Sequence, residues 1–439
     1  MTPAEHKRRR RRLMRMMEPD SIAILPAATE RLRNRDVHYP YRQDSDFHYL
    51  TGFPEPDAVA VLIPGRSHGE YVLFCRPRDA GKELWDGPRA GQEGAIEHFG
   101  ADDSFPISDL DEILPRMLEQ CERVYYAMGC DADLDRRMSE WINLIRGRAR
   151  TGVHAPIEFI ALDHYLHELR LVKSPAEVRI MRKAARISGR AHVRTMQACV
   201  PGMKEFQLQA EFEHECMREG ARHQAYPAIV GGGANGCVLH YIANNEDLED
   251  GDLVLIDAGC EFDHYASDIT RTFPVNGRFS KAQRQIYSVV LEAQLAAIDA
   301  VQPGAHWNAP HEAAVKSITR GLRLLGLLKG TVPRLIKDEA YRDFFPHRTG
   351  HWLGMDVHDV GDYKIDGTWR QLEPGMVLTV EPGIYIQSGT RGVPKKWWGI
   401  GIRIEDDVLV TRDGHEVLSA SAPKRIDDIE TVMAGARSG

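Results

Sequence analysis

Two segments of the chain follow the same pattern at a constant offset of 124 residues. Residues 248–259 read LEDGDLVLIDAG, and residues 372–383 read LEPGMVLTVEPG. Each begins with Leu-Glu, passes through a glycine into a short apolar run typical of a buried strand, and ends with an acid two positions before another glycine. Although ordinary turn chemistry could also produce such a match, the repeat favours a fold with two matching strands. Each strand would end in a carboxylate, Asp257 or Glu381.

The two carboxylates belong to strand faces that we expect to be buried. Side chains alternate between the two faces of a strand, so Asp257 shares its face with Leu253 and Leu255. Glu381 shares a face with Val377 in the same way. An acid on a buried face is costly unless a cation pairs with it. The segment DAGCEFDHYASD at 257–268 is therefore either a solvated acidic loop or part of a cation site.

The pattern of apolar and polar residues changes near residue 170. Residues 20–165 alternate short apolar runs with helical or loop segments, which is typical of an α/β sheet domain. Ser174, Pro175 and Glu177 then match the N-cap, N1 and N3 positions of a capping box. Helical windows follow at 204–220, 281–301 and 309–328, between strand-like segments. We predict an α/β domain over 1–170 and an α+β domain over 171–439.

Charge and cysteine content narrow the class of protein. The 439 residues include 64 acidic and 56 basic ones, so we expect no nucleic-acid partner. No stretch approaches the roughly eighteen apolar residues of a membrane span, so we expect no membrane partner either. The seven cysteines form no C-x-x-C pair, which indicates a reducing compartment. We therefore expect a cytoplasmic protein that acts on small molecules or peptides.

Five consecutive arginines occupy positions 8–12, and the sequence does not determine their role. No apolar segment follows them, so they fit neither a secretory nor a twin-arginine export signal. We predict that they form the basic face of a surface helix, with Leu13, Met14 and Met17 turned inward.

The segment between the two repeats and the strand after them supply further candidate ligands. PHRTGHWLGMDVHD at 346–359 contains three histidines, and GIGIRIEDDVLV at 399–410 reads as a strand in which Arg403 and Glu405 share a face. The inward-facing set is four carboxylates and one imidazole, without a thiolate: Asp257, Asp268, His351, Glu381 and Glu405. Such hard ligands suit divalent Mn, Co, Fe, Mg or Zn. Four negative charges suit two ions better than one.

The ordered motifs LIDAG, SDITRTFPV, HRTGHWLGMDVHD, LTVEPGIYI and GIRIEDD resemble those of the pita-bread metallopeptidases, which include methionine aminopeptidase, prolidase and aminopeptidase P. The resemblance covers about 174–425, and YPYRQDSDFHYLTGF at 39–53 resembles the creatinase-type N-terminal domain of aminopeptidase P and prolidase. It implies a pita-bread catalytic domain with a pseudo-twofold internal repeat. The match is most similar to bacterial aminopeptidase P, which removes the first residue from peptides whose second residue is proline.

The resemblance implies metal ligands residue by residue. Asp257 would bind the first ion with two oxygens, and Asp268 and Glu405 would bridge both ions. His351 and Glu381 would serve the second ion. Manganese is the metal we expect, with Co, Zn, Fe and Mg as alternatives, because carboxylate-rich sites accept several ions. A hydroxide shared by the two ions would attack the scissile Xaa-Pro carbonyl.

The resemblance also implies residues that contact the substrate. His240 and His358 match two histidines that contact the scissile peptide without binding metal, and Glu381 would carry a proton to the leaving nitrogen. His347 matches a residue lining the proline pocket. Three further positions near the ligands or the substrate-binding wall also have ordinary packing interpretations: Tyr226, Tyr385 and Arg403.

Other functions and the assembly remain open at this stage. Prolidase uses nearly the same motifs to cut Xaa-Pro dipeptides, and some pita-bread proteins are metal-free enzymes or peptide-binding modules. Trp85 lies in GKELWDGPRAG, which reads as a loop, and resembles a tryptophan that reaches a neighbouring subunit's active site in tetrameric members. The alternative is burial within its own domain. The resemblance implies a homodimer or homotetramer.

Overall fold

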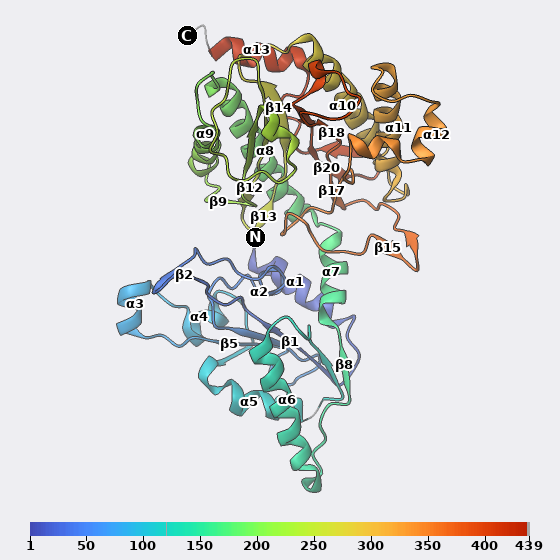
Figure 1. Cartoon of the computed structure of the whole chain (residues 1–439). Helices are drawn as coiled ribbons and strands as arrows, with labels where there is room; N and C mark the ends of the chain where they lie inside the picture. The colour runs from blue at the N-terminus through green and yellow to red at the C-terminus, as the bar shows by residue number, and fades with distance from the viewer. Residues whose placement is uncertain (120, 437–439) are drawn as a thin grey trace. The chain divides into compact units, whose positions relative to one another are not determined.

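The structure is a computed structural model that describes residues 1–119 and 121–436 (Figure 1). The chain divides into two compact units, Met1–Leu169 and Arg170–Gly439. The predicted order, an α/β part followed by an α+β part, is confirmed. Among the helices in the described part of the chain, none has the length and hydropathy needed to cross a bilayer.

A mixed six-stranded sheet forms the centre of the N-terminal unit. Its strand order is β6-β5-β4-β1-β7-β8, with β1 antiparallel to β4 and parallel to β7. Its strands are β1 Ser21–Pro26, β4 Val59–Leu62, β5 Tyr71–Cys75, β6 Asp103–Pro106, β7 Arg123–Tyr125 and β8 Glu158–Ile160, beside a small hairpin of β2 Leu32–Asn34 and β3 Val37–His38. The helices are α1 Pro3–Met14, α2 Ser45–Thr51, α3 Ala80–Asp86, α4 Gly91–Glu97, α5 Leu110–Leu118, α6 Ala132–Gly147 and α7 Leu162–Leu171. Apolar residues from the sheet, α5 and α6 form its core.

The arginine run lies on α1, and the predicted basic surface face is correct for Arg8, Arg11 and Arg12 but not for the two arginines between them. Leu13 is buried as expected, yet Arg9 and Arg10 are also buried. Arg9 donates to the Tyr49 carbonyl at 3.1 Å and Arg10 to the Leu50 carbonyl at 2.8 Å. Because each guanidinium has a carbonyl acceptor, its burial is compensated. These acceptors lie 40 residues away in the sequence, so periodicity could not reveal them.

Short antiparallel sheets flanked by long helices make up the C-terminal unit (Figure 1). Helix α8 packs on α9 and on β12, and α10 packs on α11 and on β19. The helices are α8 Pro175–Ala198, α9 Glu205–Arg218, α10 Lys281–Asp299, α11 Ala309–Leu324, α12 Val332–Lys337 and α13 Ile426–Ala436. The predicted capping box of α8 is confirmed, since the Glu177 N–H donates to Ser174 Oγ and the Ser174 N–H donates back to the Glu177 carboxylate.

The strands of this unit form five small sheets within the described residues. The sheets are β10-β11-β14, β13-β12-β9, β17-β20-β21, β18-β19 and β15-β16. Their bounds are β9 His223–Gln224, β10 Ile229–Gly232, β11 Leu253–Asp257, β12 Cys260–Phe262, β13 Tyr265–Ala266, β14 Thr270–Pro274, β15 Lys364–Ile365, β16 Thr368–Trp369, β17 Val377–Val380, β18 Gly383–Ile386, β19 Ile400–Arg403, β20 Asp406–Val410 and β21 His415–Val417.

The first copy of the sequence repeat is the antiparallel pair of β11 and β14. Asp257, the last residue of β11, lies opposite Thr270, the first residue of β14. Asp268 stands two positions before Thr270 in the sequence. The segment between them is a hairpin of β12 and β13 rather than a solvated loop. One end of this strand pair therefore carries two carboxylates.

The second copy has the same construction. Strand β17 pairs with β20 so that Val380 lies opposite Asp406. Glu381 follows Val380 directly, and Glu405 directly precedes Asp406. The strands that the repeat predicted, β11 and β17, are thus both buried strands that lead into a carboxylate. The internal repeat of the sequence becomes two strand pairs, each with two acids at one end.

Candidate metal centre and substrate cavity

A cavity of about 350 Å³ lies where the ends of the two strand pairs meet. Its walls include ten of the residues selected from the sequence: Tyr226, His240, Asp257, Asp268, His347, His351, His358, Glu381, Arg403 and Glu405. They come from positions more than 170 residues apart in the chain, and the fold brings them to one place. Glu261 and Asp263, the other acids of the opening segment, lie on the β12–β13 hairpin and are not among the residues that line this cavity.

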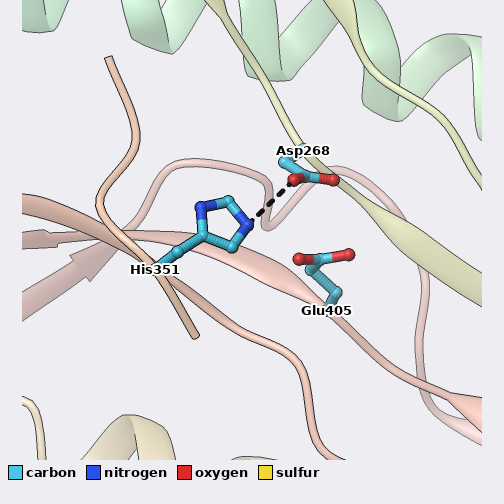
Figure 2. A group of neighbouring side chains, drawn as sticks. All are labelled: Asp268, His351 and Glu405. Atoms are coloured by element: carbon cyan, nitrogen blue, oxygen red, sulfur yellow. Dashed lines mark ion pairs between the residues drawn. The ribbon is translucent and has the colours of Figure 1, made fainter. Parts of the chain in front are cut away.

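Three of the predicted ligands form a compact triad (Figure 2). One donor atom from each of Asp268, His351 and Glu405 lies within 4.8 Å of the other two. His351 Nε2 lies 3.3 Å from Asp268 Oδ2. The Nδ1 atom of the same ring donates to the Trp352 carbonyl at 2.9 Å, which leaves Nε2 as the nitrogen that can bind a metal. The ring is therefore held in the tautomer that a metal ligand needs.

Asp257 extends this triad through Tyr226 and Arg403. Arg403 Nη2 donates to Asp257 Oδ2 at 2.5 Å. The Tyr226 hydroxyl oxygen lies 2.7 Å from Asp257 Oδ1 and 2.5 Å from Asp268 Oδ1. A hydroxyl has one proton and can donate to only one of these carboxylates. The Tyr226 hydroxyl therefore joins the two carboxylates but satisfies only one of them at a time.

The pKa shifts show an excess of negative charge in the cavity. Burial, followed by the charges of Asp268 and Glu381, raises the pKa of Glu405 well above its usual range. Burial also raises the pKa of Glu381 from 4.5 to about 7, against the opposing charges of His351 and Arg403. For His351, burial would lower the pKa, but its contact with Asp268 outweighs this effect and raises the pKa to about 9. Asp268 differs from Glu405 and Glu381, because burial would raise its pKa but the contact with His351 outweighs burial and lowers it.

This donor set fits divalent metal ions. It offers carboxylate oxygens and one correctly oriented imidazole nitrogen, the ligands that Mn, Co, Fe, Mg and Zn accept. Arg403 donates to one of the four carboxylates, Asp257, at 2.5 Å. Burial and the charges of Asp268 and Glu381 raise the pKa of Glu405, and bound cations would relieve this repulsion.

The other histidines of the cavity are bound differently. His347 Nδ1 lies 2.7 Å from the Arg348 carbonyl and Nε2 lies 2.8 Å from the Tyr385 hydroxyl, so both ring nitrogens are already hydrogen-bonded. Burial, and then the charge of Arg403, lowers the pKa of His347 to about 3. The ring is therefore neutral and presents apolar edges to the cavity.

His358 and His240 lie beside the candidate ligands without belonging to the triad. The His358 ring packs edge-on against His351 with 4.4 Å between ring centroids. Burial, and then the charge of His351, lowers the pKa of His358. His240 is exposed on the cavity wall. Both imidazoles are therefore placed where they can contact a ligand in the cavity.

Tyr385 lies behind the cavity rather than on its wall. Its hydroxyl accepts from Arg403 Nη1 at 3.0 Å and contacts His347.

Sequence reasoning missed Thr270, whose hydroxyl donates to Glu405 Oε2 at 2.6 Å and accepts from Arg403 Nε at 3.1 Å. Its place directly opposite Asp257 in the strand pair was the available signal. Sequence reasoning also missed the apolar wall of the cavity: Pro227, Ile229, Leu239, Ile242 and Val357.

Trp85 belongs to the N-terminal unit and is not on the loop that the sequence indicated. It lies on α3, a short helix whose N-cap Asp79 accepts from two backbone N–H groups. The side chain is 86 % exposed, so burial within this chain is wrong. An exposed indole of this size remains open to contact with another molecule.

Comparisons with known proteins agree with this geometry. The sequence model of metallopeptidase family M24 matches residues 179–412, and that of the aminopeptidase P N-terminal domain matches residues 6–125. The Xaa-Pro aminopeptidase of Escherichia coli K12 is 47 % identical over 434 residues, covering 99 % of this chain and 98 % of that protein.

Solved structures give the same picture. The aminopeptidase PepP of Pseudomonas aeruginosa matches with a TM-score of 0.99 and 60 % identity, covering 100 % of this chain and 99 % of that one. Escherichia coli aminopeptidase P in complex with substrate matches with a TM-score of 0.97 and 46 % identity over 100 % of both chains. The fold is therefore an aminopeptidase P N-terminal domain followed by a pita-bread catalytic domain. With carboxylates and an imidazole gathered in the cavity of that second domain, this chain belongs to metallopeptidase family M24.

Proposed function

We propose that this protein is an Xaa-Pro aminopeptidase, a hydrolase that removes the first residue from peptides whose second residue is proline. The observation that carries the proposal is the convergence of four carboxylates and His351 on one cavity, with donor atoms of Asp268, His351 and Glu405 close enough to hold a metal ion. The similarity to Xaa-Pro aminopeptidases over nearly the whole length supports it. The two parts of the chain, 1–170 and 171–439, would then be an accessory and a catalytic domain.

Five residues would hold two divalent ions. Asp257 would bind the first ion, and Asp268 and Glu405 would lie between the two. His351 and Glu381 would complete the second site. Two such ions, when bound, lower the pKa of a shared water and polarise a substrate carbonyl. We propose manganese as the native metal, because an oxygen-rich set with one nitrogen is hard in character.

The remaining cavity residues would bind the substrate and move protons. The His240 and His358 rings, both at the cavity, would donate hydrogen bonds to the scissile carbonyl as charge develops on it. Glu381 would carry a proton to the leaving proline nitrogen. Tyr226 would donate its single proton to Asp257 or Asp268 and so keep the carboxylates in place.

The walls around His347 suit a proline ring. An Xaa-Pro bond is a tertiary amide without an N–H, so its pocket needs apolar surface rather than an acceptor. His347 meets this need because both of its nitrogens are occupied. Tyr385 holds the ring by one nitrogen, and Arg403 holds Tyr385. His347 and Arg403 would form one wall of the proline pocket, and Tyr385 would hold both side chains from behind.

We also propose a homodimer or homotetramer in the cytoplasm, with Trp85 in contact with a neighbouring subunit. The exposure of Trp85 on α3 supports a contact with another chain. The seven free cysteines, six of them buried, support a reducing compartment. The acidic net charge of −8 gives no reason to expect a nucleic-acid or membrane partner.

Peptide length tests the proposed activity directly. Protein depleted of metal and reconstituted with manganese should release the first residue from Xaa-Pro-Yaa tripeptides and longer peptides. The matched control is the same peptide with alanine in place of proline, which should be cut far more slowly. Activity confined to Xaa-Pro dipeptides would show a prolidase instead. Equal activity with and without metal would refute the proposal.

A further inference from the structure

A carboxylate outside the cavity lies at the base of the loop that carries His240. Glu205 is the first residue of α9, and its side chain is fully buried. Its Oε1 atom accepts a hydrogen bond from the Gly232 N–H at 2.8 Å and another from Asn235 Nδ2 at 3.0 Å. Both donors precede His240, at the start of the loop between β10 and β11.

The second oxygen of Glu205 holds the other side of the same loop. Oε2 accepts from the Tyr241 hydroxyl at 2.8 Å and from the Glu246 N–H at 3.0 Å. The Glu205 N–H donates in turn to the Glu246 carbonyl at 3.0 Å. Four neutral donors therefore surround one carboxylate and compensate its burial without a cation. Hydrogen bonds to an ionised acceptor are about twice as strong as neutral ones, which makes this a firm anchor.

The anchored loop presents its other side chains to the cavity. His240 and Ile242 flank Tyr241 and line the cavity, while the Tyr241 hydroxyl points to Glu205. Asn244 adds a second anchor: it is buried, its Nδ2 donates to the Ala228 carbonyl at 2.8 Å, and its backbone has a left-handed φ of 46°. Hydrogen bonds therefore fix the base of the loop, while His240 and Ile242 face the cavity.

We propose that Glu205 is a positioning residue for the reaction, which acts by fixing His240 at the cavity wall. The inference rests on the proposed role of His240 as a donor to the scissile carbonyl. Glu205 is not among the residues that line the cavity, so its effect on the reaction passes through the loop. A donor that is displaced by a fraction of an ångström stabilises the transition state less, while ground-state binding by the rest of the cavity continues.

Two substitutions weaken the anchor to different extents. Tyr241→Phe removes one of the four hydrogen bonds. Glu205→Gln is more severe, because either orientation of the amide sets its NH2 group against two donors. We expect Glu205→Gln to lower kcat by about tenfold or more, with KM within about twofold of the parent and the metal content unchanged. Tyr241→Phe should show the same pattern more weakly. In the metal-free protein, amide hydrogen exchange of residues 233–246 should speed up in both variants.

A double-mutant cycle with His240→Ala separates positioning from a general loss of stability. If Glu205 acts through His240, Glu205→Gln should cost less than about twofold in kcat when His240 is already alanine. An equal loss in both backgrounds, with His240→Ala itself impaired, overturns the inference and leaves the role of His240 intact. A normal kcat in His240→Ala overturns that role and the inference together.

Tyr126→Phe provides a matched control. The Tyr126 hydroxyl donates to Asp135 Oδ1 at 2.7 Å in the N-terminal unit, so its removal deletes another tyrosine–carboxylate bond away from the cavity. We expect a small loss of stability and an unchanged kcat. A fall in kcat equal to that of Tyr241→Phe would show that any such loss slows the enzyme, and would overturn the inference.

Discussion

Glu405 and Asp406 are neighbours in the chain and both buried, yet their surroundings are opposite. Asp406 accepts hydrogen bonds from Arg271 Nη2 at 2.7 Å and Lys424 Nζ at 2.6 Å. Burial would raise its pKa, but these two cations outweigh burial and lower it. Glu405 instead accepts from the Thr270 hydroxyl and faces other carboxylates, and burial raises its pKa. One carboxylate is neutralised within the fold, and the other is not.

The difference separates carboxylates that stabilise the fold from those that serve the cavity. Asp359 belongs with Asp406, because Lys173 Nζ and Arg170 Nη2 donate to it at 2.9 Å and 2.6 Å. Burying a charge without a partner costs several kcal/mol, and the cations beside Asp406 and Asp359 remove this cost within the fold. The cavity acids are available to bind cations that the chain itself does not provide.

The largest expected effect is on activity, from the removal of a cavity carboxylate. Asp268→Ala should lower turnover on Xaa-Pro-Yaa peptides on the order of 10² or more and should lose bound metal at the same time. The reason is that Asp268 lies in the ligand triad with His351 and Glu405. Elemental analysis beside a steady-state assay measures both. Two ions retained together with near-normal turnover would contradict the assignment.

A substitution at Asp406 should act on stability instead. Asp406→Ala leaves the buried Arg271 without its carboxylate partner, and breaking a buried pair costs about 3–5 kcal/mol. Urea unfolding monitored by fluorescence should show this loss, and the folded fraction should still bind metal. If the variant is as stable as the parent but has lost its metal, Asp406 belongs to the cavity group and the comparison is wrong.

The contribution of Glu381 to the free energy of unfolding should change with pH in the opposite direction from that of an ordinary ion-paired acid. Burial raises its pKa from 4.5 to about 7, so between these values the folded metal-free protein binds more protons than the unfolded chain. The contribution of this group to the free energy of unfolding therefore falls as pH rises from 4.5 to 7, by up to about 3 kcal/mol.

Glu381→Gln tests this sign. Without metal, the variant should be more stable than the parent at pH 8 and equal to it near pH 4, measured by urea unfolding in the presence of a chelator. Added manganese should stabilise the parent more than the variant, because only the parent gains a neutralised carboxylate. A variant less stable than the parent at pH 8 without metal would show that Glu381 is already compensated.

The smallest effect on stability should come from a substitution in an exposed ion pair. Arg182 makes a two-bond contact with Glu416, at 2.7 Å for both hydrogen bonds, but the side chains are 45 % and 39 % exposed. Glu416→Gln should change the free energy of unfolding by less than about 1 kcal/mol, because solvent and salt screen the pair. A loss as large as that of Asp406→Ala would mean that burial does not set the scale of these energies.

Much of the fold could be predicted from local sequence patterns. The capping box predicted the start of α8, and the helical windows predicted α9, α10 and α11. The two errors have different causes, one long-range and one local. Arg9 and Arg10 are buried against carbonyls 40 residues away, which no helical period can reveal. Trp85 lies among glycines that favour a loop, yet Asp79 caps a short helix there.

The residues of the candidate site could be predicted from the sequence, but their geometry could not. The repeat indicated Asp257 and Glu381, and the alternation of a later strand put Glu405 on one face with Arg403. The single proton shared by Tyr226 between Asp257 and Asp268, and the buried anchor at Glu205, were not accessible. These depend on distances between groups that the sequence separates by 27 or more residues.

The sequence by itself indicated which chemistry this protein carries, because hard ligands around two matching strands are the donors that divalent cations accept. Only the tertiary structure decided which groups neutralise each acid. Glu405 and Asp406 are adjacent in the sequence, and the fold gives Arg271 and Lys424 to Asp406 but not to Glu405. The physical reason is that a carboxylate's pKa depends on burial and on charges within a few ångströms, and long-range packing alone sets both.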